Sequence, residues 1–249
     1  MATEVIAPGL GAATRSREST PPGHAVFDLD GTLIDSVPLC TEILNSMLAD
    51  RGAPFRLSQA QTRPHVTAGG TAMVAALLGG YCGDPSRAIA EFRERYASLP
   101  TLASSLYPAV RQGLAELQSL GIGLAMWSNK PQLLCEKVVD DLGLADCFTA
   151  VVGTGLGIPL KPDPFGLRRA LALAGGTRAR SCYIGDSELD GEAARRARVP
   201  FIRVTYGYGG PAGPRGERAV DDFAAVPAAV ADLLASLARS QPKPARDRR

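Results

Sequence analysis

The sequence predicts an α/β fold with a Rossmann-like parallel sheet core and an inserted all-helical domain. From residue 107 onward, short apolar segments alternate with segments whose apolar residues recur at helical spacing. A further apolar run, residues 25–29, lies near the N-terminus, whereas residues 37–106 contain no convincing buried strand. Strands that alternate with helices are typical of a parallel sheet covered on both faces.

The individual elements follow from apolar spacing and from start and stop signals. Asp35 and Ser36 can cap the first helix, and Pro38 suits its first turn. Helices are expected over residues 39–48, 72–78, 87–99, 110–120, 132–142, 165–174, 187–197 and 227–237. Strands are expected over residues 25–29, 122–127, 149–152, 182–184 and 201–204.

These elements divide the chain into two expected units. Residues 23–36 and 107–240 form the core domain that contains the sheet, and residues 37–106 form the helical insert. Residues 1–22 and 241–249 lack periodicity, and we expect them to be a flexible tail and a disordered tail.

The composition is that of an ordinary soluble globular protein, with 45% hydrophobic and 21% charged residues. A net charge of +2 argues against a nucleic acid or a membrane surface as partner. No apolar run approaches the roughly 20 residues of a membrane span, and no signal peptide is visible. The five cysteines show no Cys-x-x-Cys spacing, which indicates reduced thiols, no zinc site and a cytoplasmic location.

Two aspartates, Asp28 and Asp30, end the first expected strand and are followed by Gly31 and Thr32. Their spacing of two places both carboxylates on the same side of an extended chain. Like charges this close repel, so the pair favours a bound cation or a shared proton. The alternative is an ordinary junction of strand and turn, but charges that interrupt a buried run are costly.

Polar residues follow a later strand at 122–127, at the edge of the sheet where ligands bind in such folds. Ser128 and Asn129 come directly after this strand, and Pro131 suits the first turn of the next helix. The backbone amides near Asn129 can therefore bind an anion. Alternatively, Ser128 or Asn129 only caps the helix.

Two further segments carry charged residues near expected strand ends. Lys161 precedes the helix-start signal Asp163, where its ammonium can reach a phosphate. Asp186 lies at the tip of the strand at 182–184 and is available for a metal. Ser187 and Asp190 have the spacing of a capping box, which explains Ser187 without any catalytic role.

The four segments, in this order, resemble the four motifs of the haloacid dehalogenase superfamily, whose members are mostly Mg²⁺-dependent phosphatases. The resemblance extends from about His24 to Leu237. It implies that Asp28 is the nucleophile and Asp30 the general acid and base. A carboxylate nucleophile divides hydrolysis into formation and breakdown of an aspartyl phosphate, and a second carboxyl group moves the protons.

The resemblance also assigns the remaining site residues. Ser128, Asn129 and Lys161 bind the phosphoryl group. Mg²⁺ is bound by Asp28, the backbone carbonyl of Asp30, and Asp186, with Asp190 supporting these ligands from behind. A hard cation of this kind prefers oxygen ligands and neutralises charge on the phosphoryl oxygens.

The helical insert corresponds to the family's cap, which closes over the site and excludes water. Residues 63–70 resemble the substrate loop of the cap in phosphoglycolate phosphatases, although Thr67 stands where a glycine is expected. Arg63 is expected to bind a substrate carboxylate through two hydrogen bonds, or else to be a solvated arginine. Residues 204–208 resemble the same group of phosphatases.

The resemblance therefore implies a Mg²⁺-dependent phosphatase that hydrolyses a small phosphorylated metabolite, 2-phosphoglycolate in first place, as a monomer or homodimer. The alternatives are a sugar-phosphate mutase, a nucleotide or sugar phosphatase of the same family, and a non-catalytic binding protein with this fold. Dehalogenases do not keep the second aspartate, here Asp30. Phosphonoacetaldehyde hydrolysis needs a cap lysine, and residues 37–106 contain none.

Overall fold

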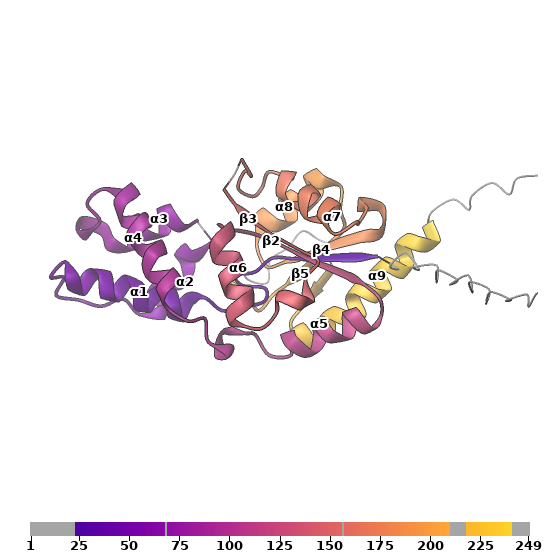
Figure 1. The fold of residues 1–249 in the computed structure, drawn as a ribbon, viewed down its shortest axis with the longest axis horizontal. Coiled ribbons are helices and arrows are strands. Elements are labelled where there is room, and N and C mark those ends of the chain that lie inside the picture. The colour runs from indigo at the N-terminus through magenta and orange to yellow at the C-terminus, as the bar shows by residue number, and fades with distance from the viewer. Residues whose placement is uncertain (1–22, 68, 156, 210–217, 241–249) are drawn as a thin grey trace, which may run out of the picture.

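A parallel sheet of six strands lies at the centre of the core in the computed structural model, which describes residues 23–67, 69–155, 157–209 and 218–240 (Figure 1). The predicted tails, residues 1–22 and 241–249, lie outside the described residues. The strand order is β3-β2-β1-β4-β5-β6. The strands are β1 (His24–Phe27), β2 (Gly123–Pro131), β3 (Ala150–Thr154), β4 (Ser181–Gly185), β5 (Phe201–Val204) and β6 (Arg218–Val220).

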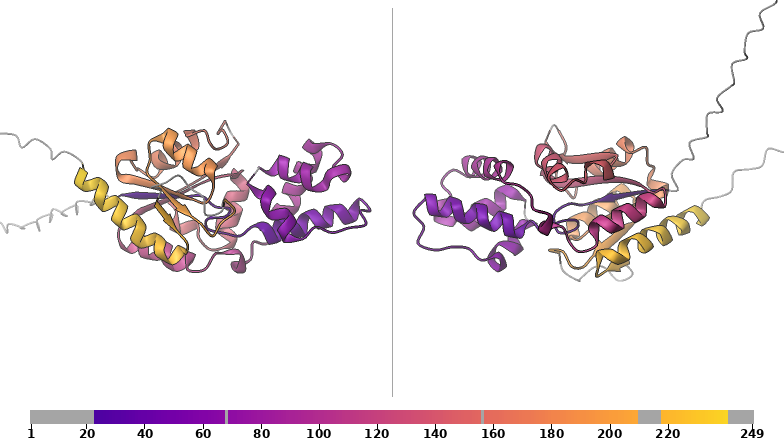
Figure 2. Two further views of the ribbon diagram at one scale, coloured as in Figure 1. Left: turned by 180° about the vertical axis from the view of Figure 1, so that it is seen from behind. Right: turned by 60° about the horizontal axis from the view of Figure 1, so that its bottom comes forward.

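Helices cover both faces of this sheet, as the two views of Figure 2 show. Neighbouring residues of β1 point to opposite faces: Phe27 packs with α5, α6 and α9, whereas Val26 packs with α7 and α8. These helices are α5 (Val110–Ser119), α6 (Gln132–Asp141), α7 (Phe165–Leu173), α8 (Glu188–Ala197) and α9 (Val226–Ser240). The predicted fold class is confirmed.

Between β1 and α5, the chain forms four α-helices that pack together at one end of the molecule (Figure 1). They are α1 (Val37–Asp50), α2 (Gln59–Val66), α3 (Gly70–Leu78) and α4 (Pro85–Ser98). Short 3-10 helices are found at Gly79–Tyr81, Ala103–Ser105, Ala145–Cys147, Arg178–Arg180 and Phe223–Ala225. We propose the division predicted from the sequence, a core of residues 23–36 and 107–240 and a cap of residues 37–106.

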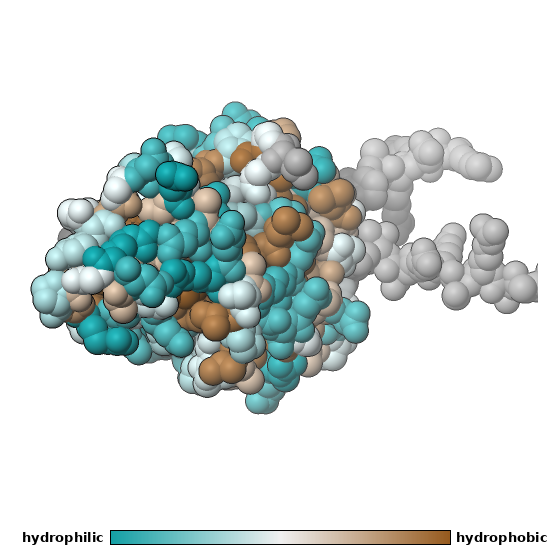
Figure 3. Space-filling model, turned by 60° about the vertical axis from the view of Figure 1, so that its left-hand side comes forward, coloured by the Kyte–Doolittle hydropathy of each residue, from teal (hydrophilic) through white to brown (hydrophobic). Residues whose placement is uncertain are grey.

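The outer face of this helical end carries mostly hydrophilic side chains, with small and separate hydrophobic patches (Figure 3). The interior is apolar, and α4 buries Ala88, Ile89, Phe92 and Tyr96 along one side. Asp84 caps α4 by accepting a hydrogen bond from the Arg87 amide at 2.9 Å. The four helices therefore bury a small core of their own beside the sheet.

Several elements differ from the expected ones. The strand expected at 122–127 continues as β2 to Pro131, and its pairing with β3 shifts between Trp127 and Pro131. Neither α2, which contains Pro64, nor the three-residue β6 was expected. The cap of α1 involves Asp35, whose Oδ1 accepts from the Val37 amide at 3.1 Å, while Ser36 makes no side-chain cap.

The last helical stretch corrects one expectation about membranes. Phe223–Ser240, 18 residues long, is apolar enough to cross a membrane by length and composition alone, although no such run was expected. In this structure α9 packs against α5 and β4, and it buries Val230, Leu233 and Leu234 in the core. A buried core helix meets the same criteria, so length and composition do not make this helix a membrane span.

Candidate active site

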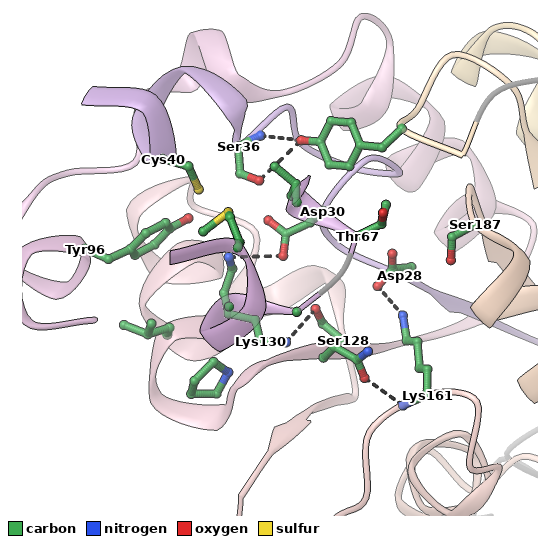
Figure 4. Close-up of a pocket in the computed structure, with 18 of the residues that line it drawn as sticks. Asp28, Asp30, Ser36, Cys40, Thr67, Tyr96, Ser128, Lys130, Lys161 and Ser187 are labelled. Atoms are coloured by element: carbon green, nitrogen blue, oxygen red, sulfur yellow. Dashed lines mark hydrogen bonds and ion pairs between the residues drawn. The ribbon is translucent and has the colours of Figure 1, made fainter. Parts of the chain in front are cut away.

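Charged side chains from three neighbouring strands and one loop meet at the carboxyl edge of the sheet. Asp28 and Asp30 follow β1, Lys130 lies in β2 and Lys161 lies between β3 and α7 (Figure 4). Asp186 follows β4. All five line a cavity of about 120 Å³ between the core and the helical cap. The predicted motifs, which are far apart in the sequence, thus lie together in one site. This is expected because the carboxyl ends of parallel strands meet at one edge of the sheet.

Lys161 connects two of the predicted carboxylates. Its Nζ forms an ion pair with Asp28 and lies 2.8 Å from Asp190 Oδ1, and all three side chains are buried. Burial opposes the positive charge of Lys161, but Asp190 and Asp28 outweigh it and raise the pKa of the ammonium. Lys161 therefore stays charged at the base of the cavity, where it can bind a phosphoryl oxygen.

Asp28 itself lies in an environment that disfavours its negative charge. Burial raises the pKa of this carboxyl well above its ordinary value, and Asp190 and Asp186 add to the effect, whereas Lys161 opposes it. A ligand atom of Asp28, one of Asp186 and one of Asp190 all lie within 4.8 Å of one another. Three carboxylates this close favour a cation, and their oxygens are the ligand type that Mg²⁺ prefers.

The carboxylates of this group differ in how many hydrogen bonds they already make. Asp190 accepts from Tyr183 at 2.7 Å and from the Ser187 amide at 3.0 Å, besides its ion pair with Lys161. This arrangement includes the predicted capping box of α8. Asp190 is therefore occupied by protein partners, which suits a supporting position, and leaves Asp28 and Asp186 better placed to hold a metal.

Asp186 is enclosed by backbone that approaches it closely. It accepts from the amides of Tyr208 at 2.6 Å and Gly209 at 3.2 Å, and burial, followed by Asp190, raises its pKa to about 6. A Cβ on Gly31 would lie 2.4 Å from Asp186 Oδ2, and one on Gly207 would lie 2.5 Å from the same atom. Side chains at these two glycines would therefore displace the carboxylate.

The partner of Asp30 was missed by the sequence reasoning. Lys130 Nζ lies 3.0 Å from Asp30 Oδ2 and 4.5 Å from the centre of the Tyr96 ring, which belongs to α4. Burial opposes the charge of Lys130, but Asp30 together with Tyr96, Cys40 and Cys135 outweighs it and raises the pKa of the ammonium. The other oxygen, Asp30 Oδ1, is buried without a hydrogen-bond partner among the described residues. One signal was available: Lys130 follows the predicted Ser128 and Asn129 directly.

Ser128 and Asn129 both line the cavity, but neither caps α6. Ser128 Oγ accepts from the Lys130 amide at 3.2 Å, and Asn129 Oδ1 accepts from the Lys161 amide at 2.8 Å. The residue before the first turn of α6 is Pro131, and no side chain in the described parts of the protein caps this helix. The capping alternative for Ser128 and Asn129 is therefore wrong. Asn129 instead fixes the loop that carries Lys161.

Arg63 lies in α2 rather than in a loop, and its guanidinium is already paired. It lies 2.8 Å from Asp35 Oδ2, and its Cζ lies 5.3 Å from the centre of the Tyr208 ring. Arg63 is not among the described residues that line the cavity. Tyr208 Oη accepts from the Ser36 amide at 2.7 Å. The contact between Arg63 and substrate stays a prediction.

The fold and the site define a class of hydrolase, and comparison with known proteins agrees. The family model for haloacid dehalogenase-like hydrolases matches residues 23–198. The chain belongs to this family, which confirms the resemblance found in the sequence.

The relatives within the family are more specific. A plasmid-encoded phosphoglycolate phosphatase of Cupriavidus necator is 35% identical over 228 residues, which are 84% of this chain and 94% of the relative. A phosphoglycolate phosphatase of Rhodospirillum rubrum is 36% identical over 217 residues, 82% of this chain and 89% of the relative. Both relatives are phosphoric monoester hydrolases by name, so the predicted type of enzyme is confirmed.

Solved structures share the fold. That of a predicted phosphoglycolate phosphatase from Haemophilus somnus has a TM-score of 0.70 at 26% identity and covers 82% of this chain and 95% of that chain. CbbY from Rhodobacter sphaeroides, in complex with phosphate, has a TM-score of 0.67 at 24% identity, over 81% of this chain and 94% of that chain. The latter likeness shows the fold alone.

Proposed function

We propose that this protein is a Mg²⁺-dependent phosphatase that hydrolyses a small phosphate monoester through an aspartyl phosphate, with 2-phosphoglycolate as its preferred substrate. The observation that carries the proposal is the position of Lys161, whose ammonium bridges Asp28 and Asp190 beside Asp186. Attack on a phosphoryl group needs a carboxylate nucleophile and positive charge that stabilises the phosphoryl oxygens. Asp28 would supply the first, and Lys161 and a metal held by Asp186 would supply the second.

The reaction would begin when a carboxylate oxygen of Asp28 bonds to phosphorus as the ester bond to the leaving oxygen breaks. Asp30 would donate a proton to that oxygen through Oδ1, the atom that has no hydrogen-bond partner among the described residues. Asp30 would then take a proton from water, whose oxygen attacks phosphorus and releases Asp28. Asp28, the Asp30 carbonyl and Asp186 would hold Mg²⁺, which neutralises charge on the phosphoryl oxygens.

The size of the cavity supports a small substrate. Its volume of about 120 Å³ is close to the roughly 150 Å³ of a cavity that holds one benzene molecule. An ester of a two- or three-carbon acid matches this space better than a nucleotide. The two relatives found by sequence are both named phosphoglycolate phosphatases, which supports the same choice.

Phosphate release from a panel of esters with and without Mg²⁺ tests the proposal. We expect the highest kcat/KM for 2-phosphoglycolate, and no turnover after chelation. Formation of an isomeric sugar phosphate would indicate the mutase instead. Preference for a nucleotide or a hexose phosphate would correct the substrate, and no release from any ester would support the non-catalytic alternative.

A further inference from the structure

One helix of the cap contributes a continuous wall to the cavity. Ile89, Phe92, Arg93 and Tyr96 of α4 all line it. Their spacing of three and four residues places them on one face of the helix. Ile89, Phe92 and Tyr96 are buried, whereas Arg93 is exposed. An arginine at the edge of an otherwise apolar and aromatic wall combines access to solvent with access to the cavity.

Arg93 also differs from the other cations of the cavity in its partners. Lys161 is paired with Asp28 and Asp190, and Lys130 is paired with Asp30. Within the described parts of the chain, Arg93 forms no ion pair with any carboxylate. Its charge is thus available to a ligand at no cost of breaking a protein ion pair.

None of the other arginines of the helical cap lines the cavity, and three of them are already in ion pairs. Arg51 and Arg95 bind Glu91, and Arg95 also binds Asp50 at 2.6 Å. Arg63 binds Asp35 at 2.8 Å. Arg56 and Arg87 are exposed and, like these three, are not among the residues that line the cavity. Among the cap arginines, the wall of the cavity therefore contains Arg93 alone.

We propose that Arg93 binds the carboxylate at the end of the substrate opposite the phosphate, and so selects short phosphorylated carboxylic acids. The inference rests on the phosphatase function proposed above. Asp28 and Lys161 hold the phosphoryl end at the floor of the cavity in the core. A guanidinium on the cap then meets the other end, where it can form two parallel hydrogen bonds with a carboxylate.

A pair of matched substrates tests this role. 2-Phosphoglycolate and 2-hydroxyethyl phosphate have nearly the same size, but the second carries a neutral hydroxymethyl group in place of the carboxylate. Arg93→Met keeps a long side chain and removes the charge. We expect kcat/KM for 2-phosphoglycolate to fall about ten- to a hundredfold, mainly through KM, because charge-assisted hydrogen bonds of roughly 1.5–3 kcal/mol are lost. Hydrolysis of 2-hydroxyethyl phosphate should change less than about twofold.

Two control variants make the result specific. Arg87→Met removes an exposed charge from the same helix and should leave both substrates unaffected. Arg63→Met tests the residue that the sequence had suggested. Unchanged selectivity in Arg93→Met, or a selective loss in Arg63→Met instead, would overturn the assignment. Wild-type enzyme that hydrolyses both esters equally well would overturn it too, whereas wild-type enzyme that hydrolyses neither would refute the proposed function itself.

Discussion

Lys130 and Asp30 form an ion pair of 3.0 Å in which the lysine side chain is 11% exposed and the aspartate side chain 19%. The same ammonium lies over the ring of Tyr96 from the cap helix α4. One cation therefore contacts both the proposed general acid of the core and the helix that covers the site. This contact connects the position of α4 with the orientation of Asp30.

The ion pair predicts a loss of catalysis in Lys130→Met. Without the ammonium, Asp30 Oδ2 loses its ion-pair partner, and we expect kcat to fall about ten- to a hundredfold for all esters alike. Steady-state kinetics with 2-phosphoglycolate and an aryl phosphate would measure this. Lys137→Met is the matched control, because Lys137 pairs with Asp141 away from the cavity. A normal kcat in Lys130→Met would remove Lys130 from the positioning of Asp30.

Asp28→Asn should abolish turnover. The amide cannot form the covalent phosphoryl intermediate, so we expect phosphate release to fall by on the order of a thousandfold or more. The Tm without metal should not fall, because the substitution removes one of three clustered carboxylates. Rapid acid quench with labelled substrate would detect the phosphorylated wild-type protein and not the variant. Phosphate release at the normal rate by folded Asp28→Asn protein would exclude Asp28 as the nucleophile.

Metal binding can be measured apart from activity. At a Mg²⁺ concentration about 100 times Kd, binding stabilises the folded state by about 2.7 kcal/mol, which raises Tm by roughly 5–10 °C for a chain of this size. Asp186→Asn should lose most of this rise, since Asp186 contributes one of the clustered oxygens. Asp232→Asn, an exposed carboxylate on α9, should keep it. An equal rise in wild type and Asp186→Asn would contradict the metal assignment.

His24 predicts part of the pH dependence of stability. Its ring is buried, Nε2 lies 2.9 Å from the Ala174 carbonyl, and burial lowers its pKa from 6.5, with Arg180 lowering it further and the Ala174 contact opposing the shift. The unfolded chain therefore takes up a proton more readily, and the contribution of His24 is complete above about pH 6.5 and declines below it. Urea unfolding of His24→Gln across pH 5–8 should show a weaker decline than wild type.

Much of the site could be predicted because each motif follows an apolar strand. Asp28 and Asp186 end such strands, and parallel strands bring their carboxyl ends together without any knowledge of tertiary contacts. Lys161 was identified by the same reasoning, since its loop also leads from a strand into a helix. The strands of the six-stranded sheet could be predicted from the periodicity of the sequence alone, except for the short β6.

The partners of the charged residues could not be predicted. Arg63 and Asp35 are 28 residues apart, and their pairing depends on how α2 packs beside the start of α1. Pro64 concealed α2 itself, because a proline inside a helix is normally unfavourable. The position of Lys130 depends on β2 continuing beyond its apolar residues to Pro131. Arg93 carries no motif, and only the orientation of α4 places it in the cavity.

The close approach of Gly31 and Gly207 to Asp186 has a consequence for how this site tolerates change. Neither glycine offers a donor, an acceptor or a charge through a side chain. Any other amino acid would nevertheless require the Asp186 carboxylate to move and, at position 207, the backbone of Gly31 as well. Gly31 has a φ of 88° as well, which disfavours any replacement even where space allowed one. The site therefore depends on more positions than those whose side chains take part in the chemistry. It also depends on two positions at which the absence of a side chain leaves room for the Asp186 carboxylate.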